Sequence, residues 1–177
     1  MNKMGKINIL NPENIRRSGN QKACAMCYLM DGGRVLMIKR KKEPFAGKLV
    51  APGGKFESGE NPFQCIEREI FEETGLRIKN YDLKIVTSEV GPENYNWILY
   101  LFICGDFTGS VIESSEGRLV WVERDMLRYQ NMADIDRRML PYVMDDGRYF
   151  MALDYDGSRN CSIAEIKNFD REYGMER

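Results

Sequence analysis

The hydrophobic pattern of this chain consists mainly of short apolar runs bounded by turn sequences, which is typical of β-strands. Runs at residues 23–30 and 34–40 flank the turn sequence DGG and predict a β-hairpin. Two further runs, at residues 81–90 and 97–107, are separated by the turn sequence GPENYN, and the second is rich in aromatic and β-branched residues. We therefore expect a sheet with buried central strands.

A helix is predicted between these two pairs of strands, after a loop at residues 41–55. Asn61 is a suitable N-cap, Pro62 would occupy the first helical position, and Gln64 would complete a capping box. Gly75 is well placed to end the helix. One face carries an apolar stripe that can pack on a sheet, formed by Phe63, Ile66 and Ile70.

The last third of the chain adds four more elements. Residues 119–124 predict a short strand, residues 124–129 a helical segment, and residues 134–144 a second helix despite Pro141 near its end. Residues 148–157 predict a strand that runs into a turn. Strands before and after a helix, followed by a late helix, indicate an α/β fold with a mixed sheet covered on two faces.

Composition and charge narrow the class of protein. The 177 residues, 43% of them hydrophobic, suffice for one core, so we expect a single domain over residues 21–177, preceded by an N-terminal arm at residues 1–20. The 26 basic and 27 acidic residues nearly cancel, so no global field favours a nucleic-acid polymer or a membrane as partner. The N-terminus lacks the apolar core of a signal peptide, and no run approaches the roughly 20 residues that span a bilayer.

The five cysteines are scattered through apolar segments, which suits a reduced interior better than a disulfide framework. Cys24 and Cys27 form a CxxC sequence, but they lie in a predicted strand, where residues three apart point to opposite faces. The pattern does not favour zinc or redox use of this pair. We expect a soluble, cytoplasmic protein that is a monomer or a homodimer.

Candidate chemistry is concentrated in the predicted helix. Glu69, Glu72 and Glu73 lie at i, i+3 and i+4, which places three carboxylates on one helical face within one turn. Like charges at this spacing repel each other, and within the helix only Arg68 can relieve them. A bound divalent cation would also do so, although an acidic helix face is often only a solvated face.

The type of ligand narrows the choice of metal ion. Carboxylate oxygens without histidine or thiolate partners favour Mg²⁺ or Mn²⁺. Two such ions can generate a nucleophilic hydroxide and neutralise the charge on a phosphoryl group during its transfer. The pair Gly53-Gly54 before the helix lets the backbone approach ions or phosphates closely.

The spacing of the whole stretch is more specific than the acidic face alone. Gly54, Glu60, Arg68-Glu69-Ile70, Glu72-Glu73 and Gly75-Leu76 fill every specified position of a motif that resembles the Nudix box of the Nudix hydrolases. The resemblance implies an α/β/α sandwich. It also implies Mg²⁺-dependent hydrolysis of a nucleoside diphosphate that is linked to some other group.

The same resemblance implies roles for individual residues. Glu69, Glu72 and Glu73 would be metal ligands, together with the carbonyl oxygen of Gly53. Glu60 would support the water shell of the metal. Arg68 would orient a carboxylate through a charge-assisted contact.

Members of this family often take an additional carboxylate from the loop before a late strand that contains tryptophan. Here that loop offers Glu113 and Glu116, before Trp121. The spacing from Glu116 to Trp121 is similar to that of members that act on oxidised purine nucleotides, so Glu116 is preferred. It would be a metal ligand and could act as general base for the attacking water, or it is simply an exposed loop residue.

The resemblance extends loosely over residues 22–157 to the subgroup that hydrolyses 8-oxo-dGTP and related purine nucleoside triphosphates. In that subgroup an acidic pair before the last long helix reads the edge of the base, a place that Asp134 or Asp136 could take. The subgroup commonly has a tryptophan just before that pair and an asparagine before the double glycine, where this chain has Ala133 and Val50. Val50 cannot form the hydrogen bonds that a buried amide makes to a base.

The remaining candidate substrate contacts surround the glycine pair. Arg40 belongs to a basic run at residues 39–42 that either attracts phosphate or is a solvated strand end. Phe45 either stacks on a base or packs the loop. Gly54 and Lys55 are candidate contacts because they lie beside the predicted metal site.

These patterns lead to three hypotheses. The first is a Mg²⁺- or Mn²⁺-dependent hydrolase that cleaves a nucleoside triphosphate, for example 8-oxo-dGTP, to monophosphate and pyrophosphate. The second is a hydrolase of the same kind that acts on ADP-ribose, nucleotide sugars or dinucleoside polyphosphates. The third is a nucleotide-sensing module without turnover, against which the full set of carboxylates argues.

Overall fold

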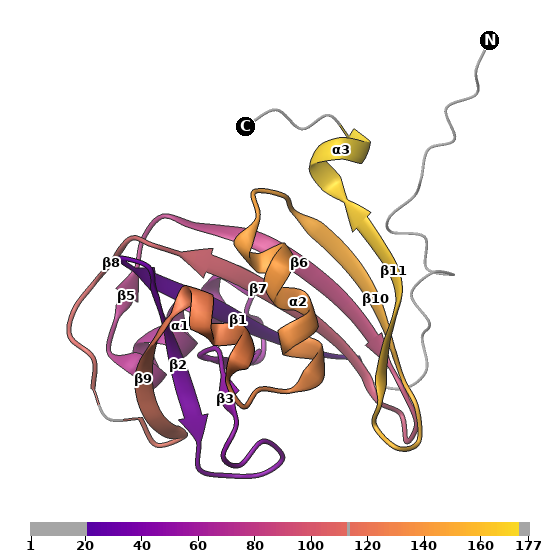
Figure 1. The fold of residues 1–177 in the computed structure, drawn as a ribbon, viewed down its shortest axis with the longest axis horizontal. Helices are drawn as coiled ribbons and strands as arrows, with labels where there is room; N and C mark the ends of the chain where they lie inside the picture. The colour runs from indigo at the N-terminus through magenta and orange to yellow at the C-terminus, as the bar shows by residue number, and fades with distance from the viewer. Residues whose placement is uncertain (1–20, 113, 174–177) are drawn as a thin grey trace.

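A mixed sheet of nine strands dominates the computed structural model, which describes residues 21–112 and 114–173 (Figure 1). Among these residues the strand order is β11-β10-β6-β7-β1-β2-β3, with β4 paired to β1 and β9 paired to β2. β1 runs parallel to β7, β10 runs parallel to β6, and the other pairs are antiparallel. The N-terminal arm expected at residues 1–20 lies outside the described residues.

The elements follow one another in this order along the chain: β1 (Lys22–Asp31), β2 (Arg34–Arg40), β3 (Leu49–Val50), β4 (Gly53–Lys55), α1 (Pro62–Thr74), β5 (Arg77–Ile78), β6 (Tyr81–Val90), β7 (Asn96–Cys104), β8 (Phe107–Thr108), β9 (Gly117–Glu123), the 3₁₀ helix η1 (Arg124–Tyr129), α2 (Asp134–Met144), β10 (Tyr149–Tyr155), β11 (Cys161–Asn168) and α3 (Phe169–Tyr173).

The sheet is covered by one long helix on each face. On β1, Cys27 packs in a cluster with Ile66 of α1, whereas its neighbour Tyr28 packs in a second cluster with Met139 of α2. Figure 1 shows α2 in front of the sheet, in orange. Because alternate residues of a strand face opposite sides, each central strand contributes to both clusters. The predicted α/β fold with a mixed sheet between two helices is confirmed.

The two strands of the N-terminal hairpin separate shortly after the turn. β1 pairs with β2 only over Leu29–Asp31, and farther along it pairs with β4 over Cys24–Met26. Between these stretches the N–H of Cys27 donates to the carbonyl oxygen of Pro52 at 2.9 Å. The segment expected to be a plain loop therefore contains two short strands, and it is inserted into the opening of the sheet. This insertion brings the glycine pair next to α1.

Other differences from the predicted elements have local causes. The strand expected at residues 97–107 ends at Cys104, and Phe107 then pairs with Ile78 of β5 in a separate two-stranded sheet. β11 follows a tight turn after β10 and is largely exposed, so it lacks a clear apolar alternation. Within the described residues, no helix has both the length and the apolarity needed to cross a lipid bilayer.

The cysteines behave as the strand periodicity predicts. Cys27 is buried in the cluster on the α1 face, while Cys24 packs against the cluster on the α2 face. All five cysteines are free thiols.

A buried lysine connects β6 to the end of α2. Lys84 is 5% exposed, and its Nζ donates to the carbonyl oxygens of Asp145 and Gly147 at 2.7 and 2.5 Å. It lies where the register between β6 and β7 shifts, between Leu83 and Ile85. Because α2 must be held against the sheet at this end, Lys84 fixes the turn that leads into β10.

We expect Lys84→Met to lower the free energy of unfolding by about 2–3 kcal/mol, because two partly buried carbonyl oxygens lose the charged donor of a buried lysine. Chemical denaturation measures this loss. Lys79→Met, at an exposed lysine, is the control. An equal loss in the two variants would show that Lys84 does not anchor the turn.

Candidate active site

The helix that carries the acidic residues begins and ends where its capping residues predict. Asn61 Oδ1 accepts hydrogen bonds from the N–H groups of Phe63 and Gln64, both at 3.0 Å, and the Gln64 side chain accepts from the N–H of Asn61. At the other end Gly75 has φ +76°, a left-handed conformation that favours glycine. These caps fix the rotation of α1 and therefore the direction of its acidic face.

The glycine pair allows close contacts on two sides of β4. A Cβ at Gly53 would lie 2.1 Å from the carbonyl oxygen of Ala25 in β1, and the φ of Gly53 is +148°. A Cβ at Gly54 would lie 2.3 Å from Glu69 Oε1. Gly53 therefore permits the pairing of β4 with β1, and Gly54 leaves room for the Glu69 carboxylate.

Arg68 connects the carboxylates of the motif to one another. Its Nε and Nη2 donate to the two carboxylate oxygens of Glu60, at 2.6 and 2.9 Å, and Nη1 donates to Glu69 and Glu72 at 2.9 and 3.1 Å. Nη2 also donates to the carbonyl oxygen of Lys55 at 3.0 Å. The guanidinium lowers the pKa of Glu60 to about 2. It also offsets the repulsion between Glu69 and Glu72.

Glu73 binds to the backbone of the glycine pair. Its Oε2 accepts the N–H of Gly53 at 2.7 Å. Burial, with smaller contributions from the charges of Glu69 and Glu116, raises the pKa of Glu73 to about 7, although the Gly53 hydrogen bond and Arg40 oppose the shift. Burial also raises the pKa of Glu69. Acidic groups with raised pKa values beside a glycine-rich loop are typical of functional sites.

Carboxylate oxygens are donors that suit a hard divalent cation. In this arrangement, however, they form hydrogen bonds with other groups of the protein. Glu69 and Glu72 bind Arg68, and Glu73 binds the N–H of Gly53. Within the described ranges, no three acidic, cysteine or histidine side chains form a preassembled metal cluster. Oxygen donors alone, as here, fit Mg²⁺ or Mn²⁺ rather than zinc.

The loop before β9 brings a further carboxylate to this region. Glu116 Oε2 lies 3.2 Å from Arg40 Nη2, and Oε1 lies 3.8 Å from Lys42 Nζ. The charge of Glu116 contributes to the raised pKa of Glu73. The alternative candidate, Glu113, lies outside the described residues.

Comparisons with known proteins identify the family of this chain. The model of the NUDIX domain matches residues 20–143. The chain belongs to the Nudix family. It is therefore a Nudix hydrolase, as the spacing of the motif predicted.

The relatives show how far the similarity extends. The uncharacterized Nudix hydrolase YvcI of Bacillus subtilis is 35% identical over 123 residues, which cover 67% of this chain and 76% of the relative. The oxidized purine nucleoside triphosphate hydrolase of Danio rerio is 26% identical over 137 residues, which cover 77% and 88%. The crystal structure of the mutator MutT protein from Bacillus halodurans has a TM-score of 0.71 and 27% identity, and the match covers 83% of this chain and 97% of that chain.

The predicted substrate contacts of this Nudix hydrolase lie in different environments. Val50 is buried in β3, and Phe45 is 39% exposed in the loop before it. Lys55 Nζ lies 5.7 Å from the centre of the Trp97 ring. The side chain of Asp134 is 74% exposed, with a long ion pair to Arg138 at 3.9 Å.

Asp136 differs from Asp134 because it lies against the sheet. Burial and, to a smaller extent, the negative charge of Glu89 raise the pKa of Asp136 to about 7, although Lys48 opposes the shift. Of the two acidic residues that could read a base, only Asp136 is thus partly enclosed, and its pKa is raised by the charge of a second carboxylate, Glu89.

That second carboxylate belongs to a polar and aromatic cluster that the sequence analysis missed. Glu89 is 7% exposed, and it accepts hydrogen bonds from Thr87 Oγ1 at 2.8 Å and from the Tyr95 hydroxyl at 2.9 Å. The rings of Tyr95 and Tyr155 lie 5.0 Å apart, and Trp97 is opposite Glu89 in the strand register. A signal was present, because Glu89 continues the inward-facing positions of Ile85 and Thr87.

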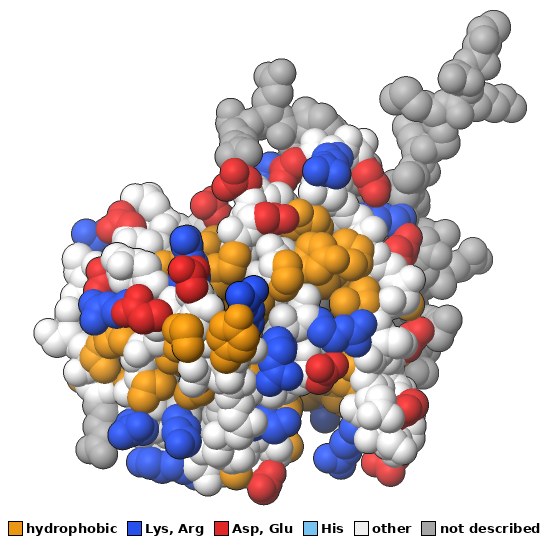
Figure 2. Space-filling model, in the orientation of Figure 1, with side chains coloured by type: hydrophobic (Ala, Val, Ile, Leu, Met, Phe, Trp, Pro, Cys, Tyr) orange, Lys and Arg blue, Asp and Glu red, His pale blue; other side chains and the backbone are white. Residues whose placement is uncertain are grey.

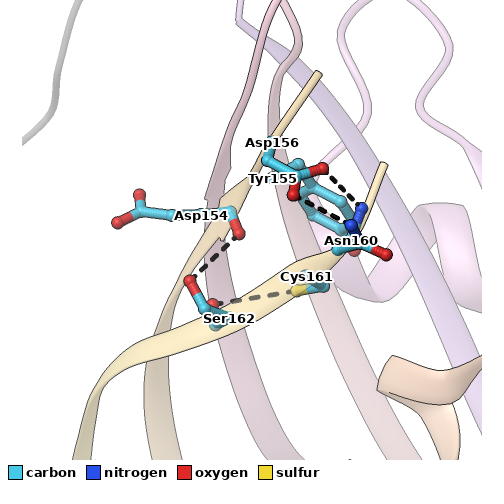
Figure 3. A pocket seen from close by; sticks show the side chains of 6 residues that line it. All are labelled: Asp154, Tyr155, Asp156, Asn160, Cys161 and Ser162. Atoms are coloured by element: carbon cyan, nitrogen blue, oxygen red, sulfur yellow. Dashed lines mark hydrogen bonds between the residues drawn. The ribbon is translucent and has the colours of Figure 1, made fainter. Parts of the chain in front are cut away.

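A separate pocket lies at the turn between β10 and β11 (Figure 3). Its volume is about 230 Å³, and Asp156 closes the turn by accepting from the N–H groups of Ser158 and Asn160 at 2.8 and 2.9 Å. None of the predicted site residues lines it. The lining residues are Asp154, Tyr155, Asp156, Asn160, Cys161 and Ser162.

The two glycines should differ in what an added methyl group does. In Gly53→Ala the new Cβ meets backbone, so we expect a loss of unfolding free energy of about 3 kcal/mol or more. In Gly54→Ala the three nearest atoms belong to the movable end of Glu69, so we expect a loss below about 1 kcal/mol but a fall in hydrolysis of at least about tenfold.

Denaturation and turnover assays on both variants test this expectation. Gly105→Ala is the control, since its Cβ would meet only ordinary contact at 3.9 Å from the Met30 carbonyl oxygen. Full activity in a folded Gly54→Ala variant would contradict the role of the close contact with Glu69.

The raised pKa of Asp136 predicts how stability depends on pH. The folded protein binds this proton more tightly than the unfolded chain, because the pKa rises from 3.8 to about 7 on folding. This contribution is present in full below pH 3.8 and is lost as the pH rises through about 7. At pH 8 we expect Asp136→Asn to be more stable than the wild type by about 2 kcal/mol, less than the full pKa difference because the side chain is partly open to solvent.

Denaturation at pH 4 and pH 8 measures this difference, which should vanish at the lower pH. Asp134→Asn removes the same charge from an exposed position of the same helix and is the control. Equal pH profiles for the two variants would contradict the expectation.

Proposed function

We propose that this Nudix hydrolase cleaves a nucleoside triphosphate, including oxidised purine nucleotides such as 8-oxo-dGTP, to the monophosphate and pyrophosphate. The observation that carries the proposal is the convergence of Glu69 and Glu73 on Gly53 and Gly54, with Glu116 held by Arg40 in the loop before β9. Carboxylates next to a stretch of backbone without side chains suit a substrate made of phosphate groups and divalent cations. The match to the oxidized purine hydrolase over most of its length supports the choice of nucleotide.

In this proposal Glu69, Glu72 and Glu73 hold Mg²⁺ or Mn²⁺, together with the carbonyl oxygen of Gly53. The cation, when bound, neutralises phosphate charge and makes water a better nucleophile. Arg68 keeps the carboxylates correctly oriented through Glu60. Glu116 accepts the proton of the attacking water.

The base is proposed to bind on the α2 face of the sheet, near Asp136. A partly enclosed carboxyl group next to Glu89 is suited to accept hydrogen bonds from N–H donors of a purine. Val50 offers no such hydrogen bond, because it is apolar and buried in β3. Recognition would therefore depend on Asp136 and its surroundings rather than on an amide before the glycine pair.

A nucleotide panel with separated products tests the function. We expect pyrophosphate and monophosphate from dGTP or 8-oxo-dGTP in Mg²⁺, and a kcat at least about 100-fold lower in Glu72→Gln and Glu73→Gln, since each removes a charged ligand. Glu67→Gln changes the remaining glutamate of α1, which instead accepts from the Tyr81 hydroxyl, and should retain activity.

Each alternative gives a different result in the same panel. Cleavage of ADP-ribose, a nucleotide sugar or a dinucleoside polyphosphate in place of the triphosphates would replace the proposed substrate. Tight nucleotide binding without turnover in either metal would indicate a sensing module. Undiminished activity in both glutamine variants would exclude the assigned metal ligands.

A further inference from the structure

Arg40, at the end of β2, has one N–H group that donates no hydrogen bond to the described residues. Its Nη2 lies 3.2 Å from Glu116 Oε2. Its Nε is buried and has no acceptor among residues 21–112 and 114–173. Leaving a buried donor of a charged group unpaired costs about 1–3 kcal/mol. This N–H therefore indicates a position for an acceptor oxygen from outside the described chain.

The carboxylate that Arg40 contacts is held firmly by the adjoining strands. β2 and β9 pair as far as Arg40 and Gly117, and the N–H of Lys41 donates to the carbonyl oxygen of Glu116 at 3.0 Å. Gly117 permits this approach, because a Cβ there would lie 2.2 Å from the carbonyl oxygen of Lys39. Glu116 is thus fixed at the backbone, and the direction of its side chain depends on Arg40 and, more weakly, on Lys42.

A guanidinium is suited to two partners at once. Its N–H groups lie in one plane and point in different directions, so it can bind a carboxylate on one side and a phosphate oxygen on another. The side chain of Arg40 is 21% exposed, whereas that of Lys42 is 65% exposed and lies 3.8 Å from Glu116. Of the two cations, only Arg40 is enclosed enough to impose a direction on the carboxylate.

We propose that Arg40 links the diphosphate of the substrate to Glu116: Nη2 holds the carboxylate, and Nε–H binds a phosphate oxygen. Substrate binding would then complete the hydrogen bonds of Arg40 and fix Glu116 beside Glu73. Arg40 is in this respect a positioning residue for Glu116 as well as a contact to the substrate. The inference deepens the proposed function and rests on it for the identity of the substrate.

The experiment compares Arg40→Lys with Lys42→Gln, its neighbour in the same basic run, after thermal unfolding has shown that both variants fold. Binding of inorganic pyrophosphate is measured by calorimetry in buffer that contains Mg²⁺. We expect about tenfold weaker binding in Arg40→Lys, since lysine keeps the charge but loses the directed Nε–H, and less than about twofold in Lys42→Gln. Arg40→Gln, a second variant, should bind at least as weakly as Arg40→Lys.

A second measurement tests the link to Glu116. We expect Arg40→Lys to lower kcat about tenfold by itself but less than about twofold in a Glu116→Gln background, because the residue that it positions is already lost. The weaker pyrophosphate binding should persist in that background, which separates the phosphate contact from the positioning role.

Three results would overturn the proposal. Equal weakening in Arg40→Lys and Lys42→Gln would indicate general attraction by positive charge. An equal fold-loss in kcat from Arg40→Lys in the wild type and in the Glu116→Gln background would exclude the positioning role. Unchanged pyrophosphate binding in both Arg40 variants would exclude the phosphate contact. If the wild type hydrolyses no nucleotide, the proposed function fails, while the pyrophosphate titration still decides the contact at Arg40.

Discussion

The close approach of β4 to both β1 and α1 is the contact on which the rest of the site depends. β4 enters the sheet because β1 and β2 separate after a short pairing. It can lie there only because Gly53 presents no side chain to the carbonyl oxygen of Ala25. Gly54 then faces Glu69, and the N–H of Gly53 binds Glu73, so backbone and acidic helix come together without an intervening side chain.

Two arginines offset the negative charge of the carboxylates that this arrangement brings together. Arg68 contacts Glu60, Glu69 and Glu72, and Arg40 contacts Glu116. Figure 2 shows acidic and basic side chains interspersed over one face of the molecule, which agrees with a net charge of -1. The acidity of the site is thus balanced locally, and in the proposed function a cation or phosphate would replace contacts that the protein already makes.

How much the sequence predicts depends on whether a feature is local. The bounds of α1 follow from Asn61, Pro62 and Gly75, because capping is decided within a few residues. The motif predicted the family for the same reason, since its spacing is that of one loop and one helix. β3 and β4 were missed because strands of two or three residues carry no periodicity and form only by entering an opening made elsewhere. Contacts between distant segments, such as Lys84 with Gly147, leave no local pattern either.

The same distinction separates the residues predicted to carry the reaction from those predicted to bind the base. The acidic face of α1 lies on one side of the sheet, and Asp136 of α2, with Glu89 behind it, lies on the other. β4 joins the two sides, because Gly54 meets Glu69 while the next residue, Lys55, extends its amino group over Trp97 of β7. The α1 side is encoded in one continuous stretch. The α2 side is assembled from four segments that are far apart in the chain, namely β6, β7, α2 and β10. A motif can therefore identify the family of this protein, whereas in the proposed function the choice of nucleotide would depend on how those segments pack.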